Sequence, residues 1–99
     1  MSKFKELINS ETPVLVDFYA DWCSPCKMMA PILKQVKDSL GNNIRIVKID
    51  TEKYPAISQA YSIRSIPTMI LFKNGEPTWT TSGVMNANQL IENLKYYLN

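Results

Sequence analysis

The sequence predicts an α/β protein with a mixed sheet of about four strands and helices on both faces. Short apolar runs of strand length alternate along the chain with segments whose apolar residues recur at helical spacing. A long helical segment separates the first two strand-like runs, which makes these two strands parallel. The last two runs flank Asn74-Gly75, a pair typical of a tight hairpin turn, and are therefore antiparallel.

The first part of the chain predicts a helix, a strand and a second helix. Ser2 is placed to cap a short helix whose apolar face contains Phe4, Leu7 and Ile8. Residues 14–20, VLVDFYA, form the nearly continuous apolar run expected of a strand buried on both faces. The second helix ends at Gly41, and its apolar stripe contains Met29, Ile32, Leu33, Val36 and Leu40.

The second part predicts two further helices and three strands. Residues 44–50, IRIVKID, are the second strand, and a short helix follows with Pro55 in its first turn. In the hairpin TMILFKNGEPTWTTS, Pro77 places the second strand at the edge of the sheet, because proline cannot donate to a ladder. Asn86 opens a last helix, whose apolar residues are Ala87, Leu90, Ile91, Leu94 and Leu98.

Size and charge indicate one compact domain over residues 1–99 that binds neither nucleic acid nor membranes. The chain has 45% apolar residues and a net charge of +2, with basic and acidic residues interspersed. It has no apolar run near the length of about 18 residues that a membrane span needs. The first residues, MSKFKELINSE, lack the apolar core of a signal peptide, so we expect a cytoplasmic protein. We also expect a monomer.

The two cysteines lie where the first strand gives way to the second helix. Free backbone N–H groups and the helix dipole at Cys23 favour negative charge, which lowers the pKa of a thiol and makes it a nucleophile. Cys26, in the first turn, is within disulfide reach of Cys23, and Pro25 stiffens that turn. The spacing predicts a reversible dithiol–disulfide switch.

Two other interpretations of the cysteine pair remain open. Zinc needs about four ligands, and the chain has no histidine and no third cysteine, so only a zinc site shared between two chains is possible. An inert pair is the other alternative. A purely structural disulfide is disfavoured because it closes a very small loop in a chain long enough to form its own core.

The motifs WCSPCK, RSIPT and LFKNGE, together with VLVDFYA, resemble the thioredoxin family over nearly the whole chain. The resemblance implies the thioredoxin fold and the reduction of protein disulfides. It implies that Cys23 attacks a target disulfide and that Cys26 resolves the mixed disulfide. It also implies a thioredoxin reductase as electron donor and no cofactor beyond the redox-active pair, in keeping with the absence of a Gly-x-Gly-x-x-Gly nucleotide motif.

The resemblance assigns three further residues to catalysis. Asp17 matches a buried carboxylate that accepts the proton of the Cys26 thiol, and its place inside an apolar strand independently predicts a raised pKa. A solvent-facing Asp17 is the alternative. Lys48 matches a lysine that pairs with this aspartate, although by type it is equally a solvated strand residue. Pro67 matches a cis-proline that faces the disulfide, whereas residue type alone predicts a trans bond.

The resemblance also implies a contact surface for target proteins. Ile66 would offer backbone groups to an extended substrate. Ser24 and Pro25, which lie between the cysteines, would also contact the substrate. Trp22 matches a surface indole that touches targets, with a core aromatic as the alternative. Gly83 matches a glycine on the rim of this surface, with an ordinary turn glycine as the alternative.

The chain departs from the family pattern at four places. Tyr19 stands where the family often has a second tryptophan, which we interpret as a packing substitution. Ser24 replaces a usual glycine, and we hypothesise that it stabilises the Cys23 thiolate and makes the disulfide more oxidising. Ser82 replaces an apolar rim residue, which affects the preference for targets. No strand is predicted before Phe4, so we expect four strands where the family has five.

Two other functions are compatible with this sequence. One is a disulfide oxidase or isomerase of exported proteins, which the missing signal peptide argues against. The other is a non-catalytic thioredoxin-like subunit that binds a partner protein through its surface, because a fold alone does not establish a function.

Overall fold

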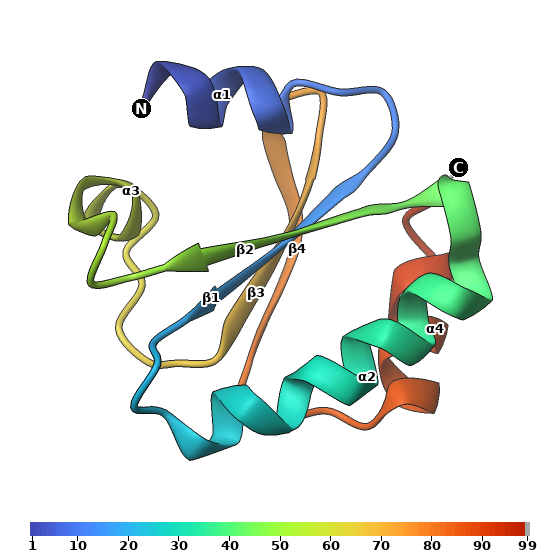
Figure 1. The fold of residues 1–99 in the computed structure, drawn as a ribbon. Coiled ribbons are helices and arrows are strands. Elements are labelled where there is room, and N and C mark those ends of the chain that lie inside the picture. The colour runs from blue at the N-terminus through green and yellow to red at the C-terminus, as the bar shows by residue number, and fades with distance from the viewer. Residues whose placement is uncertain (99) are drawn as a thin grey trace.

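The structure is a computed structural model that describes residues 1–98 of the chain. Figure 1 shows helices and strands in the predicted order. The elements are α1 (Ser2–Ile8), β1 (Val14–Tyr19), α2 (Ser24–Leu40), the 3-10 turn η1 (Gly41–Asn43), β2 (Arg45–Asp50), α3 (Pro55–Ala60), β3 (Thr68–Lys73), β4 (Glu76–Ser82) and α4 (Ala87–Lys95). Within residues 1–98, no helix has both the length and the apolar character of a membrane span.

The sheet has four strands in the order β2-β1-β3-β4. Strand β1 pairs with β2 in parallel and with β3 in antiparallel orientation, and β3 pairs with β4 in antiparallel orientation. The predicted mixed sheet is therefore confirmed, and residues 1–98 contain no strand before β1. Pro77 lies on the edge strand β4, as predicted, and a register shift beside it marks a bulge.

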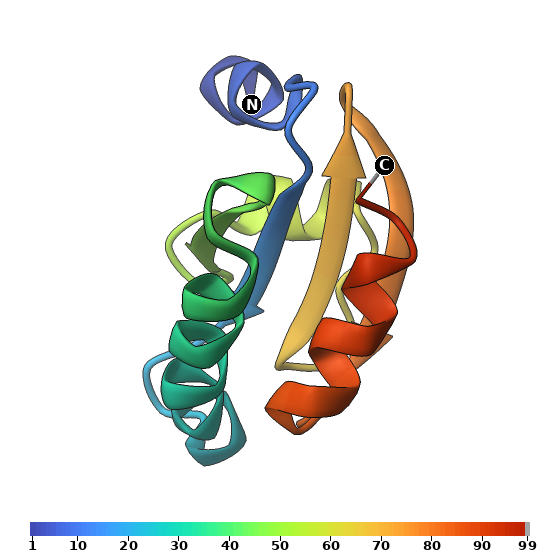
Figure 2. The same cartoon turned by 90° about the vertical axis from the view of Figure 1, so that its right-hand side faces the viewer.

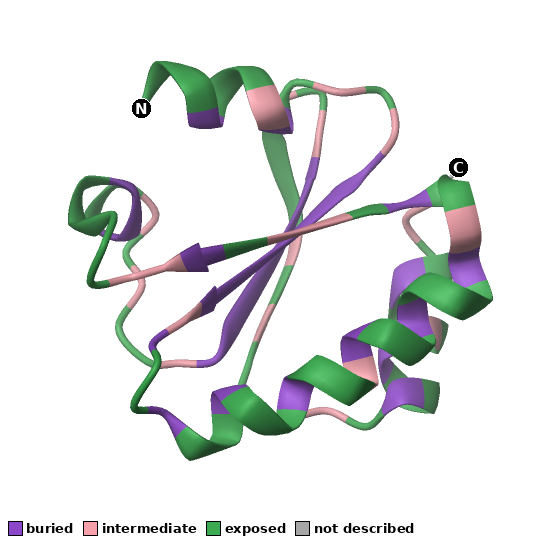
Figure 3. Ribbon diagram, in the orientation of Figure 1, coloured by how far each residue is buried: buried purple, intermediate pink, exposed green. Residues whose placement is uncertain are grey.

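Helices cover both faces of the sheet. Helices α1 and α3 pack on one face, and α2 and α4 pack on the other (Figures 1 and 2). Because side chains alternate along a strand, β1 contributes Leu15 to the core under α2 and α4, and Val14, Val16 and Phe18 to the other core. Figure 3 shows the buried residues along the strands and on the inward sides of the helices. This burial on both faces makes β1 the centre of the fold.

The ends of the helices confirm most of the sequence predictions. Helix α2 starts directly after Cys23, and Gly41 follows its last residue with a φ of +56°. The Asn86 side chain accepts the backbone N–H of Gln89 at 2.9 Å and caps α4 as predicted. The last helix ends at Lys95, so Leu98 lies beyond it, although Leu98 still packs against the core.

The prediction that Ser2 caps the first helix is wrong. Ser2 is the first residue inside α1, and Met1 occupies the cap position without a side-chain hydrogen bond. The reason is that the backbone N–H of Lys5 bonds to the carbonyl of Met1 at 2.9 Å, which extends the helix by one residue.

Ser62, just after α3, has a φ of +55°. Its N–H bonds to the carbonyl of Gln59 and the N–H of Ile63 bonds to that of Ser58, which fixes this left-handed conformation. We expect Ser62→Gly to raise the free energy of unfolding by about 0.5–1 kcal/mol in urea titrations, because glycine adopts a positive φ without the Cβ penalty. Ser39→Gly, on the exposed side of α2, is the matched control and should lower stability instead. A loss of stability at both sites would contradict this explanation.

Candidate functional site

The cysteine pair lies where β1 ends and α2 begins. Cys23 and Cys26 form a disulfide, with their Cα atoms 5.2 Å apart. Cys23 is the N-cap residue of α2, and its sulfur accepts the backbone N–H of Cys26 at 3.2 Å. The same N–H group and the helix dipole would stabilise a thiolate on Cys23 after reduction of the disulfide. The sulfur of Cys23 therefore lies at a helix N-terminus, where the sequence predicts that negative charge is favoured.

The two residues between the cysteines, Ser24 and Pro25, begin α2. Both are exposed, while the two cysteines are buried, with 3% and 4% of their surface accessible. Lys27 follows in the same turn and is also exposed. A partner that approaches the disulfide therefore meets the helix start first.

A loop distant in sequence lies against the disulfide. The Ile66-Pro67 peptide bond is cis, and the carbonyl oxygen of Ile66 lies 3.9 Å from the Cys23 sulfur, although 43 positions separate the two residues. The carbonyl of Pro67 accepts the N–H of Gly83 at 2.8 Å, which holds the segment after β4 against the same loop. Gly83 has a φ of +85°, a conformation that favours glycine. Residues 23, 66, 67 and 83 thus come together on one side of the molecule.

Trp22 lies on the surface, so the alternative of a core aromatic is wrong. The side chain is 67% exposed, and its indole N–H donates a hydrogen bond to a carboxylate oxygen of Glu52 at 2.6 Å. Beside it lies a shallow hollow of about 210 Å³, which Thr51, Ile63, Arg64, Ser65 and Ile66 line together with Trp22. The sequence analysis missed Glu52, because nothing in an exposed acid 30 positions away marks it as a partner of Trp22.

Asp17 is completely buried in the middle of β1, which rules out the solvent-facing alternative. Neither of its carboxylate oxygens has a hydrogen-bond partner among residues 1–98. Strand alternation places Asp17 on the same face as Leu15, which is the face that α2 covers. Burial raises the pKa of Asp17 to about 6, and the positive charge of Lys48 partly offsets this effect.

Lys48 lies directly opposite Asp17 in the register of β1 and β2. Its ammonium group lies over the ring of Tyr19, 4.4 Å from the centroid, in a cation–π contact that the sequence did not indicate. Within residues 1–98 Lys48 forms no ion pair with Asp17, so its influence on that carboxyl is electrostatic over a longer distance. Lys48, Tyr19 and Cys26 also line a small hollow of about 80 Å³, which has room for water.

Comparison with known proteins identifies the family. A family model described as thioredoxin matches residues 1–96. The chain belongs to the thioredoxin family. A thioredoxin-like protein of Synechocystis sp. is 53% identical over 98 residues, which are 98% of this chain and 93% of that protein. The chloroplastic thioredoxin Y of rice (Oryza sativa) is 54% identical over 95% of this chain, and the match spans 56% of the rice protein.

Solved structures confirm the predicted thioredoxin fold. A mutant thioredoxin from Halobacterium salinarum superposes with a TM-score of 0.89 at 29% identity, covering all of this chain and 86% of the archaeal one. Together with the Cys23–Cys26 disulfide, the family membership makes the protein a thiol–disulfide oxidoreductase of the kind that reduces protein disulfides. Residues 1–98 contain no cluster of three or more His, Cys, Asp or Glu side chains placed to hold a metal.

The buried Asp17 carboxyl predicts a specific pH dependence of stability. Because burial raises its pKa from 3.8 to about 6, the folded state binds this proton more tightly than the unfolded state. The free energy of unfolding should therefore fall between about pH 4 and pH 6 and stay lower above, by up to about 3 kcal/mol from this group. Urea titrations across this range should show that Asp17→Asn removes the decrease. If the free energy of unfolding of the variant decreases as much as that of the wild type over this pH range, other groups cause the decrease.

Proposed function

We propose that Cys23 is the attacking group and Cys26 the resolving group of a general protein-disulfide reductase. The observation that carries the assignment is the position of Cys23 at the N-cap of α2, with the Cys26 N–H directed at its sulfur. In the reduced protein this position favours the Cys23 thiolate. The thiolate attacks one sulfur of a target disulfide, forms a mixed disulfide and releases the other target sulfur as a thiolate.

Resolution of the mixed disulfide needs a nucleophile at Cys26. We propose that Asp17 accepts the Cys26 proton through water, after which the Cys26 sulfur attacks Cys23. The second target sulfur leaves as a thiolate, the Cys23–Cys26 disulfide forms, and two electrons have passed to the target. A buried carboxylate with a pKa of about 6 is suited to this role near neutral pH, and the hollow beside Cys26 and Lys48 offers a place for water.

We further propose that an extended segment of the target lies between Trp22 and the loop before β3. The backbone of Ile66, next to cis Pro67, would bond to this segment in a strand-like manner, and Gly83 would form the opposite rim. Glu52 holds the exposed indole of Trp22 beside the hollow, so an apolar platform is present before the target arrives. Ser24 and Pro25 would contact the target next to its disulfide.

The electron donor and the compartment belong to this proposal as well. We propose that a thioredoxin reductase returns the disulfide to the dithiol, since a carrier without a nucleotide must receive its electrons from another protein. We propose a cytoplasmic location, with the chloroplast as the alternative, because the relatives include proteins named as chloroplastic thioredoxins, from rice and Arabidopsis thaliana. Localisation of a tagged full-length protein distinguishes the two compartments.

Cysteine variants test the proposed division of roles. With dithiothreitol as electron donor, the wild type should accelerate insulin reduction, and both Cys23→Ser and Cys26→Ser should fall to the uncatalysed rate. Cys26→Ser should accumulate a mixed disulfide with insulin, visible by mass spectrometry, because Cys23 still attacks but nothing resolves the bond. If Cys23→Ser accumulates the mixed disulfide with insulin instead, Cys26 is the attacking group and Cys23 the resolving group. An inactive wild type would favour the non-catalytic binding subunit.

A substitution at Ser24 tests what sets the reduction potential of the Cys23–Cys26 disulfide. If the Ser24 residue stabilises the Cys23 thiolate, the reduced form is favoured, and Ser24→Gly should make the reduction potential more negative. Equilibration with glutathione buffers measures the potentials of both proteins. The family supplies a reference of about −270 mV for a reductase, whereas a value near about −180 mV would favour the isomerase alternative. Equal reduction potentials of the wild type and Ser24→Gly would show that Ser24 does not make the disulfide more oxidising.

A further inference from the structure

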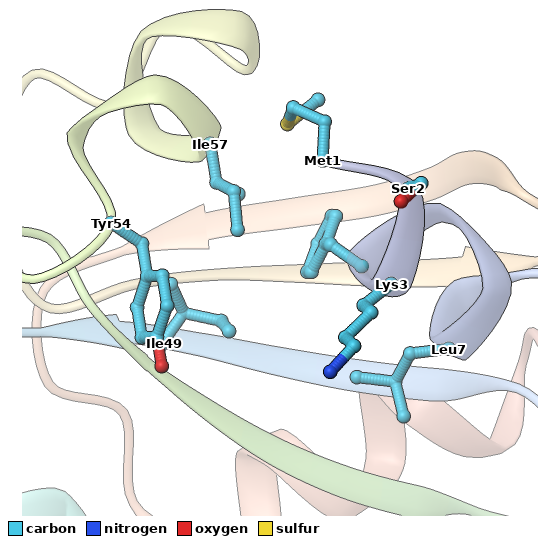
Figure 4. A pocket seen from close by; sticks show the side chains of 8 residues that line it. Met1, Ser2, Lys3, Leu7, Ile49, Tyr54 and Ile57 are labelled. Atoms are coloured by element: carbon cyan, nitrogen blue, oxygen red, sulfur yellow. The ribbon is translucent and has the colours of Figure 1, made fainter.

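The pocket of α1 and α3 has a volume of about 570 Å³ and lies away from the disulfide. Figure 4 shows the side chains that converge on it from α1, from β2 and from the start of α3. Its walls are mainly apolar and include Phe4, Ile49 and Ile57. None of its lining residues belongs to the cluster that packs around Cys23 and Cys26. The choice among targets that must reach the disulfide therefore depends on another surface.

Hydrogen bonds join the end of β4 to the cis-proline loop beside the disulfide. The N–H of Gly83 bonds to the carbonyl of Pro67 at 2.8 Å. The hydroxyl oxygens of Ser82 and Thr68 lie 3.1 Å apart, and these two residues are directly opposite in the register of β3 and β4. Thr68 is buried, with 7% of its surface accessible, whereas Ser82 is exposed. Ser82 is therefore the member of this pair that a target can meet.

The direction of the Thr68 hydroxyl proton follows from its second partner. The hydroxyl oxygen of Thr68 lies 2.6 Å from the carbonyl oxygen of Ser65, which can only accept a hydrogen bond. A hydroxyl group has one proton, so Thr68 donates it to Ser65 and can only accept at its contact with Ser82. The Ser82 hydroxyl therefore donates to Thr68 across the 3.1 Å contact.

This arrangement makes Ser82 a hydrogen-bond acceptor for any partner from outside. Its one proton is engaged with Thr68, while its oxygen can still accept at the surface. A target side chain that brings an N–H group to Ser82 gains a hydrogen bond. A carboxylate at the same place offers only lone pairs, which meet the lone pairs of Ser82, and it must give up water without gaining a bond. The hydroxyl therefore favours an amide over a carboxylate.

We propose that Ser82 is a specificity-determining residue that favours targets with Asn or Gln, over those with Asp or Glu, near the reacting sulfur. The inference rests on the proposed function, in which the target segment lies between Trp22 and the rim at Gly83. The carbonyl of Ile66, in the loop that Thr68 follows, lies 3.9 Å from the Cys23 sulfur. A target held at this loop presents a side chain close to its cysteine to the Ser82 hydroxyl.

A series of short peptides tests this preference. Each peptide is rich in alanine and glycine, has one cysteine in a disulfide with thionitrobenzoate, and carries Gln or Glu at one of three positions before or after the cysteine. The Cys23 thiolate of the reduced protein attacks the peptide sulfur and releases thionitrobenzoate, whose absorbance reports the rate. At one or more positions, the ratio of the Gln rate to the Glu rate should be about threefold higher for the wild type than for Ser82→Ala.

The ratio of the two rates cancels changes in the overall reactivity of Cys23, because both peptides react with the same protein. Thr80→Val is the matched control. It removes another hydroxyl on the same face of β4, which donates to the carbonyl of Met69 at 3.1 Å, and it should keep the wild-type ratio. The proposal is wrong if the wild type and Ser82→Ala have equal ratios at every position, or if Thr80→Val lowers the ratio as much as Ser82→Ala.

Removal of the Thr68 hydroxyl tests the direction of the protons. In Thr68→Val the Ser82 proton loses its acceptor and can turn to a carboxylate of the peptide. The ratio of the Gln rate to the Glu rate should therefore fall towards that of Ser82→Ala, although Ser82 itself is unchanged. A full wild-type ratio in Thr68→Val would show that Thr68 does not direct the Ser82 proton, and would overturn the assignment of Ser82 as an acceptor.

Insulin reduction by the wild type, measured in parallel, separates this inference from the proposed function. If the wild type reduces insulin but its preference for Gln does not depend on the Ser82 hydroxyl, the inference is wrong and the proposed function stands. If the wild type does not reduce insulin, the proposed function is wrong, and the inference fails with it.

Discussion

The start of α2 is the constraint on which the chemistry of this molecule depends. A helix leaves its first backbone N–H groups without partners inside the helix, and here one of them is directed at the sulfur of Cys23. An anion at this position gains both the hydrogen bond and the favourable end of the helix dipole. The helix can hold the sulfur there because β1, buried on both faces in the centre of the sheet, fixes where it begins.

Burial of Asp17 lowers the stability of the folded protein. A carboxyl group without a hydrogen-bond partner in the core weakens the folded state whenever it is ionised. Its neighbour across the sheet, Lys48, directs its ammonium group to the ring of Tyr19 and leaves the carboxyl only partly compensated. A group with a pKa of about 6 can exchange a proton readily near neutral pH, which suits the role that we propose for Asp17 in the resolution of a mixed disulfide.

The sheet also separates two kinds of surface. The disulfide, Trp22 and the cis-proline loop lie around the N-terminal end of α2, whereas the pocket of α1 and α3 adjoins the β2 edge. Strand β4, at one edge of the sheet, carries a proline and a bulge, which discourage pairing with another strand.

The sequence by itself determined the order of the elements, the parallel β1–β2 pair, the hairpin at Asn74-Gly75 and the place of Cys23 at a helix start, because these depend on local periodicity, turn chemistry and short spacing. The resemblance to a family added the cis bond at Pro67. Tertiary structure alone decided that Trp22 meets Glu52, that Lys48 lies over Tyr19 and that the Ile66 carbonyl lies against Cys23. These contacts join residues 29 to 43 positions apart, where the packing of the whole chain, and no local preference, selects the partner.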